Sequence, residues 1–509
     1  MRILIASFAA TFLMAAPVCA SAQTAKPVTA ETTQETPKLT TYQGDVMRAA
    51  ELAMTGQFAE ALALLDPLIA APAFKEVPGI GQYYLINLQA ELNWELRRYP
   101  QALVVYRRLT AMPQADDAAW LRRVSAAHAA GDHADAADVI ADLAGRRVET
   151  LEKFKADYIR NLALTYLPDT PEGIVRQNRL IDALFDAGWD SEGSLLWRTR
   201  AARLLDAGDA TRAAAMAAKI TAPNDRLAVS VDRRFDALRV TVPQAFAVAD
   251  ALDADLERKR SAAQVPDAAL DVRSSYASAL MTRGRFEEAL AEIDAALDRS
   301  ETKADAPAPT SDHLIWALDA RARILSFLGR HGEALSELRR AARRPEHGKQ
   351  NVSHAINLGW LYHRLGRDED ALDTIADIDD ANLAPYGRMQ RRQVQACAEH
   401  DLGREAAYKA SVAWLREHQA DDPSALEAVA ACGGDIALGA AAYLARLEDP
   451  ERRATALLQA QTYIDPPNPL PGDQRGRAYA QAVLNRPDVK AAIDRYGRIE
   501  RWPVTGPQF

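Results

Sequence analysis

The chain has 509 residues, more than the roughly 100–200 residues that one compact core usually holds. Its 70 Asp and Glu outnumber its 61 Lys and Arg, and the formal net charge of −9 argues against a nucleic-acid-binding protein, which needs a basic surface. The alternating pattern of β-strands is nearly absent, so we expect a helical protein made of several domains or of one long array.

The first 22 residues have the pattern of a secretory signal peptide. Arg2 supplies a positive charge, the apolar run from Ile3 to Ala16 is too short to span a bilayer, and Ala20-Ser21-Ala22 fits a cleavage site. A lipoprotein signal at Cys19 is the alternative, although the residues before it do not fit. We predict that residues 1–22 are removed and that the mature protein is exported without a transmembrane segment. The periplasm of a Gram-negative bacterium is the expected location, and secretion is the alternative.

Three segments of the mature chain interrupt the helical periodicity. Residues 23–39, rich in Thr, Pro, Ala and Gln, are predicted to be a disordered leader. Residues 300–312 contain several prolines and are either a hinge or a long surface loop, with the loop favoured because helical arrays absorb insertions on one face. Residues 465–509 begin with a Pro-rich break, and their two helical stretches are expected to cap the exposed apolar face of the last repeat.

Between residues 40 and 464 one short pattern recurs. A glycine ends one helix, and an alanine followed by an apolar residue comes five and six positions later in the next helix. The pattern is clearest at Gly56, Gly284, Gly329 and Gly366 and looser at Gly131, Gly208 and Gly403, while Arg97 stands where a glycine is expected. The spacing is 34–45 residues, apart from two intervals about twice as long that each hide a degenerate unit. This predicts about nine to eleven helix pairs.

The recurring glycines and alanines have a mechanical cause. A glycine at the end of a helix tolerates the left-handed backbone that closes it, and an alanine lets the next helix approach closely. Gly359, by contrast, lies inside a predicted helix, where glycine costs about 1 kcal/mol relative to alanine. We therefore expect a neighbouring helix to press against the backbone at Gly359.

With Gly359, Tyr362, Gly366, Ala371 and Leu372 at the characteristic spacing, the chain resembles the tetratricopeptide repeat (TPR) family, as an exported bacterial member with degenerate repeats. The resemblance implies an all-α fold, an α-solenoid in which antiparallel helix pairs stack into a right-handed superhelix. In such arrays the first helices of successive pairs line a concave face.

The resemblance also suggests which side chains face the concave surface. They are Trp316, Arg323, Trp360, His363 and Arg364. Tryptophan and arginine are the residue types that most often anchor protein interfaces. The alternative is that the two tryptophans only fill the core between repeats.

Motifs for catalysis or for cofactor binding are absent from the sequence. It has no HExxH, no GxxxxGK[ST] and no GxSxG, and we predict no catalytic residue, no bound metal and no cofactor. His128 and His133 are expected to be packed or solvated. Cys397 and Cys432 are interpreted as two buried thiols rather than a disulfide, because a disulfide needs strict geometry and their levels along the helices look different.

The sequence therefore predicts a non-enzymatic scaffold that binds a protein or a peptide in the bacterial cell envelope. One alternative is a periplasmic scaffold component of a polysaccharide-export or envelope-assembly machinery. A second alternative is an unrecognised hydrolase in the degenerate stretches Leu151–Ala187 or Asp225–Leu252.

Overall fold

The computed structural model describes residues 41–189, 193–302, 311–346, 348–422 and 424–506. The predicted signal peptide and leader, and most of the segment 300–312, lie outside these residues. The chain divides into two compact units, residues 1–196 (unit 1) and residues 197–509 (unit 2). The fold is all-α, and among the described residues the two short strands β1 (Thr462–Ile464) and β2 (Arg501–Thr505) form the one sheet, which is parallel.

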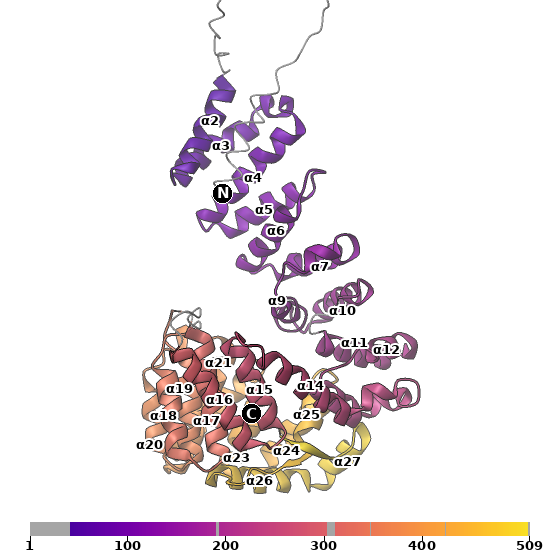
Figure 1. Ribbon diagram of the computed structural model, residues 1–509, viewed down its shortest axis with the longest axis vertical. Helices are drawn as coiled ribbons and strands as arrows, with labels where there is room; N and C mark the ends of the chain where they lie inside the picture. Colours follow the sequence, from indigo (N-terminus) through magenta and orange to yellow (C-terminus); the bar gives the residue numbers. More distant parts are fainter. Residues whose placement is uncertain (1–40, 190–192, 303–310, 347, 423, 507–509) are drawn as a thin grey trace, which may run out of the picture. The chain divides into compact units, whose positions relative to one another are not determined.

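Unit 1 consists of helix pairs that follow one another along the chain (Figure 1). Each helix contacts the next, from α2 through α7, and α7 also contacts α10. Its elements are α2 (Thr41–Met54), α3 (Phe58–Ala70), η1 (Pro72–Glu76), α4 (Gly79–Glu95), α5 (Tyr99–Thr110), α6 (Asp117–Ala129), α7 (His133–Arg146), α8 (Val148–Leu151), α9 (Ala156–Asn161), the π-helical turn η2 (Leu162–Tyr166) and α10 (Pro171–Asp186). The irregular elements α9 and η2 fall in the first degenerate stretch, Leu151–Ala187, and α8 ends where it begins.

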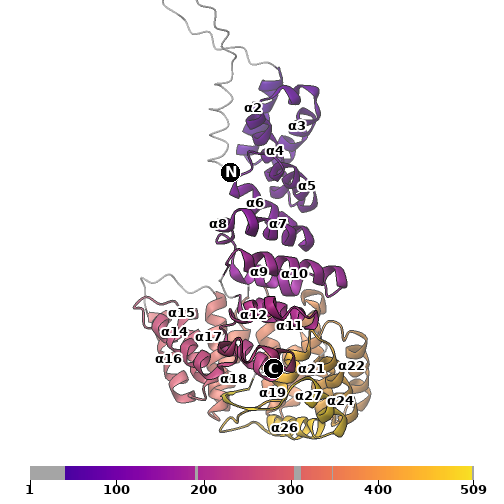
Figure 2. The ribbon, with the colours of Figure 1, turned by 90° about the vertical axis from the view of Figure 1, so that its right-hand side faces the viewer.

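Unit 2 also contains stacked pairs (Figure 2), and from α13 through α25 each helix contacts the next. The elements are α11 (Ser194–Asp206, across the boundary), α12 (Ala210–Ala217), α13 (Pro223–Val231), η3 (Arg233–Leu238), η4 (Pro243–Phe246), α14 (Val248–Ala263), α15 (Leu270–Thr282), α16 (Phe286–Thr302), α17 (Ser311–Phe327), α18 (His331–Ala342), α19 (Val352–Arg364), α20 (Asp368–Ala376), η5 (Asp380–Asn382), α21 (Pro385–Asp401), α22 (Glu405–Glu417), α23 (Ala425–Gly433), α24 (Ile436–Glu448), α25 (Arg453–Gln459), α26 (Pro471–Leu484) and α27 (Pro487–Tyr496).

The predicted turn glycines do end the first helix of each pair, with a left-handed backbone. At Gly131 the φ angle is 75°, the Gly131 amide donates to the His128 carbonyl at 3.0 Å, and the next amide donates to Ala127 at 2.8 Å. These two bonds form the motif that satisfies the last carbonyls of a helix. Arg97 has φ 56° and is the only non-glycine residue with positive φ in the described part of the chain. It therefore occupies the left-handed position at which the repeat predicts a glycine.

The close approach predicted at Gly359 is also confirmed. A Cβ atom added there would lie 3.1 Å from Ile375 Cγ2 of α20 and 3.1 Å from Val394 Cγ1 of α21. Ala371, the small residue of the second helix, is fully buried and contributes its carbonyl oxygen to the same contact, 3.5 Å away. Helices α20 and α21 thus both pack against the α19 backbone at Gly359, where there is no side chain to separate them.

The interpretation of the two mature cysteines as separate thiols is wrong. Cys397 and Cys432 form a disulfide, and their Cα atoms lie 5.3 Å apart. The reason is that α21 and α23, the first helices of successive pairs, pack directly against each other and bring the two positions to the same level. The sequence shows the helices but not their relative offset along their axes.

Unit 2 closes on itself, because its first helices contact its last ones. Helix α13 packs against α25, and Leu227, Val231 and Val504 belong to one buried apolar cluster with residues of α24 and α27. An ion pair adds to this closure, since Arg498 Nη2 lies 2.6 Å from each carboxylate oxygen of Asp236. The beginning and the end of unit 2 are therefore held together by apolar burial and by charge.

The C-terminal segment, residues 461–506, runs along the row of turns between paired helices. It contacts five pairs in succession, through hydrogen bonds from Thr505 to Met281, Asn468 to Phe327, Arg364 to Asp473, Arg475 to Asp401 and Tyr479 to Asp435. Helices α26 and α27 also pack against α24 of the last regular pair. The segment expected to cap the last repeat thus contacts the inter-helix turns of earlier pairs as well.

A left-handed backbone costs an ordinary residue about 1–2 kcal/mol, and glycine avoids this cost but loses more conformational entropy on folding. We therefore expect Arg97→Gly to raise the free energy of unfolding by about 0.5–1 kcal/mol. The matched control is Gly131→Ala, which should lower it by about 1 kcal/mol. No heavy atom lies within 4 Å of a Cβ at Gly131, so only the backbone is tested. Urea denaturation measures both, and a lower stability of Arg97→Gly would contradict the argument.

Leu470→Ala should destabilise unit 2 by about 2–4 kcal/mol, the usual cost of truncating a buried leucine. Leu470 is 1% exposed and belongs to the apolar cluster formed by α15 to α21, although it lies in the C-terminal segment. Chemical denaturation followed by circular dichroism measures the change. Lys490→Ala, an exposed substitution in α27, should stay within about 0.5 kcal/mol of the wild type. Equal stabilities would show that the segment is only loosely attached.

Candidate binding face

A large exposed aromatic side chain lies on α17. Trp316 is 48% exposed, and its ring meets the ring of His354 on α19 edge-on, with 4.7 Å between the centroids. The sequence analysis selected Trp316 and left open whether it fills the core. About half of its surface is accessible, and the other half packs within the array.

A charged pair shares the face of α17 with Trp316. Asp319 is buried, accepts a hydrogen bond from Asn357 Nδ2 of α19 at 3.1 Å, and pairs with the guanidinium of Arg323. Trp316, Asp319 and Arg323 are three and four residues apart and therefore lie on one side of the helix. We call Trp316, Asp319, Arg323 and Asn357 the α17–α19 face. Arg323 is exposed on this face, and the buried carboxylate of Asp319 holds the Arg323 guanidinium in position.

His354 lies fully buried beneath Trp316. Its ring Nδ1 is 2.9 Å from Asn351 Oδ1, and Asn351 Nδ2 in turn donates to the Ala341 carbonyl at 3.1 Å, which fixes the orientation of the amide. Nδ1 must therefore carry the hydrogen, and Nε2 is an acceptor without a partner in the described part of the chain. Burial lowers the pKa of His354, so the ring is neutral at pH 7.

The other three predicted residues lie on α19, and two of them have internal partners. Trp360 is partly buried and packs against two apolar clusters of unit 2. His363 is 5% exposed and its Nδ1 lies 2.6 Å from a carboxylate oxygen of Asp368. Arg364 forms two bonds of 2.6 and 2.7 Å with the carboxylate of Asp473 in the C-terminal segment. Trp316 and Arg323 thus lie together at the surface, whereas His363 and Arg364 bind other residues of the chain.

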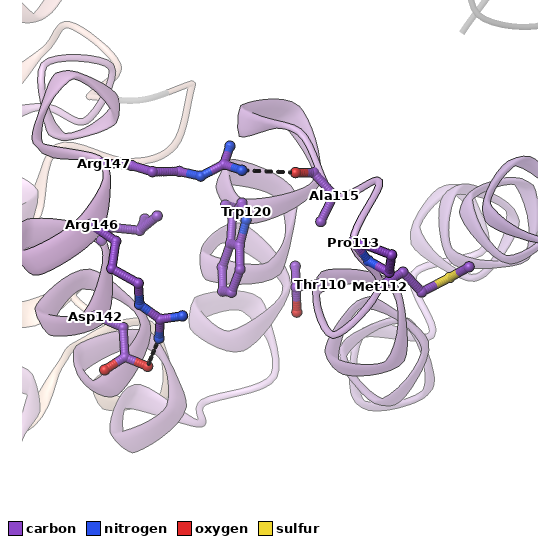
Figure 3. A pocket seen from close by; sticks show the side chains of 9 residues that line it. Thr110, Met112, Pro113, Ala115, Trp120, Asp142, Arg146 and Arg147 are labelled. Carbon is purple, nitrogen blue, oxygen red and sulfur yellow. Dashed lines mark hydrogen bonds and ion pairs between the residues drawn. The ribbon is translucent and has the colours of Figure 1, made fainter. Parts of the chain in front are cut away.

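Unit 1 has a small pocket that the sequence analysis did not select (Figure 3). It measures about 270 Å³ and lies between the end of α5, the start of α6 and the end of α7. The indole of Trp120 forms one wall. The two arginines of the wall are already paired, Arg146 with Asp142 at 3.1 Å and Arg147 with the Ala115 carbonyl at 3.2 Å. No sequence motif marks this pocket, because its walls come from three helices.

Potential metal ligands meet around His363. One group joins His363 with Cys397 and Cys432, and the other joins it with Asp368 and Asp401. In the first group the two sulfurs are bonded to each other, and in the second Asp401 already pairs with Arg475 at 2.9 Å. The donor atoms therefore have other partners. His128 and His133 are packed, as His133 stacks on Tyr166 with 4.9 Å between ring centroids and His128 meets Tyr158 edge-on at 5.2 Å.

Comparison with known proteins finds structural similarity but no sequence family. No family model matches the chain, and no curated protein does. The TPR domain of P58(IPK) is 14% identical, with 87% of this chain and 99% of that chain covered and a TM-score of 0.19. Yeast Tom70 is 10% identical, with 89% and 99% covered and a TM-score of 0.30, and the Cut9–Hcn1 hetero-tetramer is 12% identical, with 89% of each chain covered and a TM-score of 0.26.

All of these TM-scores are below 0.5, so the fold assignment rests on the helix pairs of the structure itself. Within the residues described, no helix combines the length and the apolar character needed to cross a membrane.

His354 should make stability depend on pH. The pKa of His354 in the folded protein lies below its value of about 6.5 in the unfolded chain. Below about pH 6.5 the unfolded chain therefore binds a proton that the folded chain excludes. The free energy of unfolding then falls by up to about 1.4 kcal/mol per pH unit, until the pH passes the folded-state pKa. His354→Gln should flatten the decline in unfolding free energy between pH 7 and pH 5. Burial also lowers the pKa of His331, so His331 should still contribute its part of the pH dependence in this variant. An unchanged slope in His354→Gln would contradict the buried neutral ring.

Proposed function

We propose that this chain is a non-enzymatic scaffold that holds another protein or a peptide on the α17–α19 face, and that it acts in the bacterial cell envelope after export. The observation that carries the proposal is the half-exposed Trp316 held beside the exposed Arg323 on the first helix of a stacked pair. These are the residue types that contribute most to binding energy in protein interfaces.

Both anchors are held in place before a partner arrives. The buried His354 supports the Trp316 ring, and the buried Asp319, itself held by Asn357, orients the Arg323 guanidinium. Immobilising a flexible side chain at an interface costs about 0.5–1.5 kcal/mol, and this cost is reduced when the free protein already restricts the side chain. An apolar side chain of a partner would pack on the Trp316 ring, and its backbone carbonyls or a carboxylate would accept from the remaining Arg323 N–H groups.

The location is inferred from the N-terminal sequence and from the cysteines. Residues 1–22 have the charged, apolar and small-residue regions of a signal peptide. The Cys397–Cys432 disulfide supports an oxidising compartment, since cytosolic proteins rarely keep such bonds. Together these features favour the periplasm, where a scaffold of this kind would serve an envelope assembly.

Trp316→Ala and Arg323→Ala should each weaken binding of a natural partner by about 10–30-fold, the effect of removing an anchor worth about 1.4–2 kcal/mol. A photo-crosslinking residue at position 313, one turn before Trp316, would capture the partner in cells. Calorimetry on the purified pair would then measure the affinities. Val240→Ala is the matched control, because Val240 is an 89% exposed apolar residue of the same unit. Equal affinities for all three variants and the wild type would rule out this face.

A further inference from the structure

The disulfide of unit 2 lies beside a buried carboxylate–histidine pair. His363 Nε2 is 3.8 Å from Cys432 Sγ, while Nδ1 on the other side of the ring lies 2.6 Å from Asp368. The closest donor atoms of His363, Cys397 and Cys432 all lie within 4.8 Å of one another. The residues come from α19, α21 and α23, and Asp368 begins α20, so four helices meet at this point.

We propose that this cluster is a site of thiol–disulfide exchange, in which Cys432 is the sulfur that reacts with a partner and His363 accepts its proton. Cys432 is partly exposed near the end of α23, whereas Cys397 is fully buried within α21. A partner sulfur can therefore approach Cys432, and Cys397 is placed to complete the exchange from inside.

The hydrogen bonds define the state of His363. A carboxylate can only accept, so the contact with Asp368 requires a hydrogen on Nδ1. The lone pair of Nε2 then points toward Cys432 Sγ, at a distance suited to an S–H···N hydrogen bond once the disulfide is reduced. Asp368 also stabilises the imidazolium that forms when His363 takes the proton. This is the arrangement by which a base activates a cysteine nucleophile.

The charges around Cys432 determine which group can stabilise its thiolate. Cys432 lies in the last turn of α23, where the negative end of the helix dipole disfavours a thiolate. The carboxylate of Asp401, from the end of α21, also approaches His363, and it is paired with Arg475 at 2.9 Å and with His400 at 3.1 Å. His363, whose Nε2 lies 3.8 Å from Cys432 Sγ, is placed to accept the Cys432 proton and then to offset the charge of the thiolate.

The exchange balances in atoms and electrons. In the reduced protein the Cys432 proton moves to His363 Nε2, and the thiolate attacks a partner disulfide RS–SR′. A Cys432–SR bond forms and the RS–SR′ bond breaks, and R′S⁻ leaves and takes the proton as R′SH. Cys397 then attacks Cys432 Sγ, its proton passes through His363 to the departing RS⁻, and the Cys397–Cys432 disulfide is restored. Two electrons pass from the protein to the partner disulfide, and a dithiol partner drives the reverse reaction.

The first experiment isolates Cys432. In the mature chain Cys397→Ser leaves it as the only thiol, and its thiolate can be titrated by absorbance at 240 nm. We expect a midpoint below the value of about 8.5 for a free cysteine. Adding His363→Asn should raise the midpoint by one pH unit or more. Adding His313→Asn, which removes an exposed histidine of α17, should leave it unchanged. Equal midpoints in all three proteins would overturn the proposal.

The second experiment follows the exchange itself. Reduced mature protein with both cysteines is mixed with oxidised glutathione at pH 7, and His363→Asn should react about 3–10-fold more slowly, because a midpoint raised by one pH unit lowers the thiolate fraction up to tenfold and the more basic thiolate recovers part of that loss. If that variant does not fold by circular dichroism, Asp368→Asn serves instead and should show a smaller decrease in rate, since its amide oxygen still accepts from Nδ1. Three results would refute exchange: a disulfide that dithiothreitol reduces only on unfolding, rates that do not depend on His363 or Asp368, or a reduced protein that binds zinc stoichiometrically and does not reoxidise.

Discussion

The left-handed residue that ends the first helix of each regular pair, outside the irregular connections α9–α10 and α13–α14, is the constraint on which the rest of the structure depends. It lets the chain reverse within two or three residues while the amide bonds at the turn satisfy the carbonyls that the helix leaves open. Because the reversal is so short, the two helices of a pair must lie antiparallel and in contact. The small residues at the contact, such as Ala371 opposite Gly359, then set how close the helices come.

Unit 2 shows how such an array can be closed. An open stack of helix pairs leaves an apolar face at each end, which must be covered. Here the first helices of the unit contact the last ones, and the C-terminal segment adds polar contacts along the turns of earlier pairs. Local helix pairing thus builds the array, and contacts between residues more than 100 positions apart hold its ends.

The candidate binding residues illustrate what a repeat pattern can and cannot show. Trp316 and Arg323 lie on one side of α17, because helical periodicity determines which residues share a face, while their place on a concave surface stays a prediction. The same spacing says nothing about Asp473, which lies 109 residues from Arg364 and occupies its guanidinium. It also could not reveal the neutral, buried His354 beneath Trp316, whose environment comes from another helix pair. Whether these residues bind a partner remains a prediction.

The sequence by itself determined the helices, their turns and their pairing, because these depend on neighbours within about 40 residues. Even the exceptional Arg97 could be placed in its left-handed turn from the position of the repeat. Only the tertiary structure decided that Cys397 and Cys432 are bonded, that a carboxylate and a histidine lie beside them, and that the C-terminal segment returns along the earlier turns. These features depend on the offset and curvature of stacked pairs, which accumulate over many packing contacts and leave no periodic signal in the sequence.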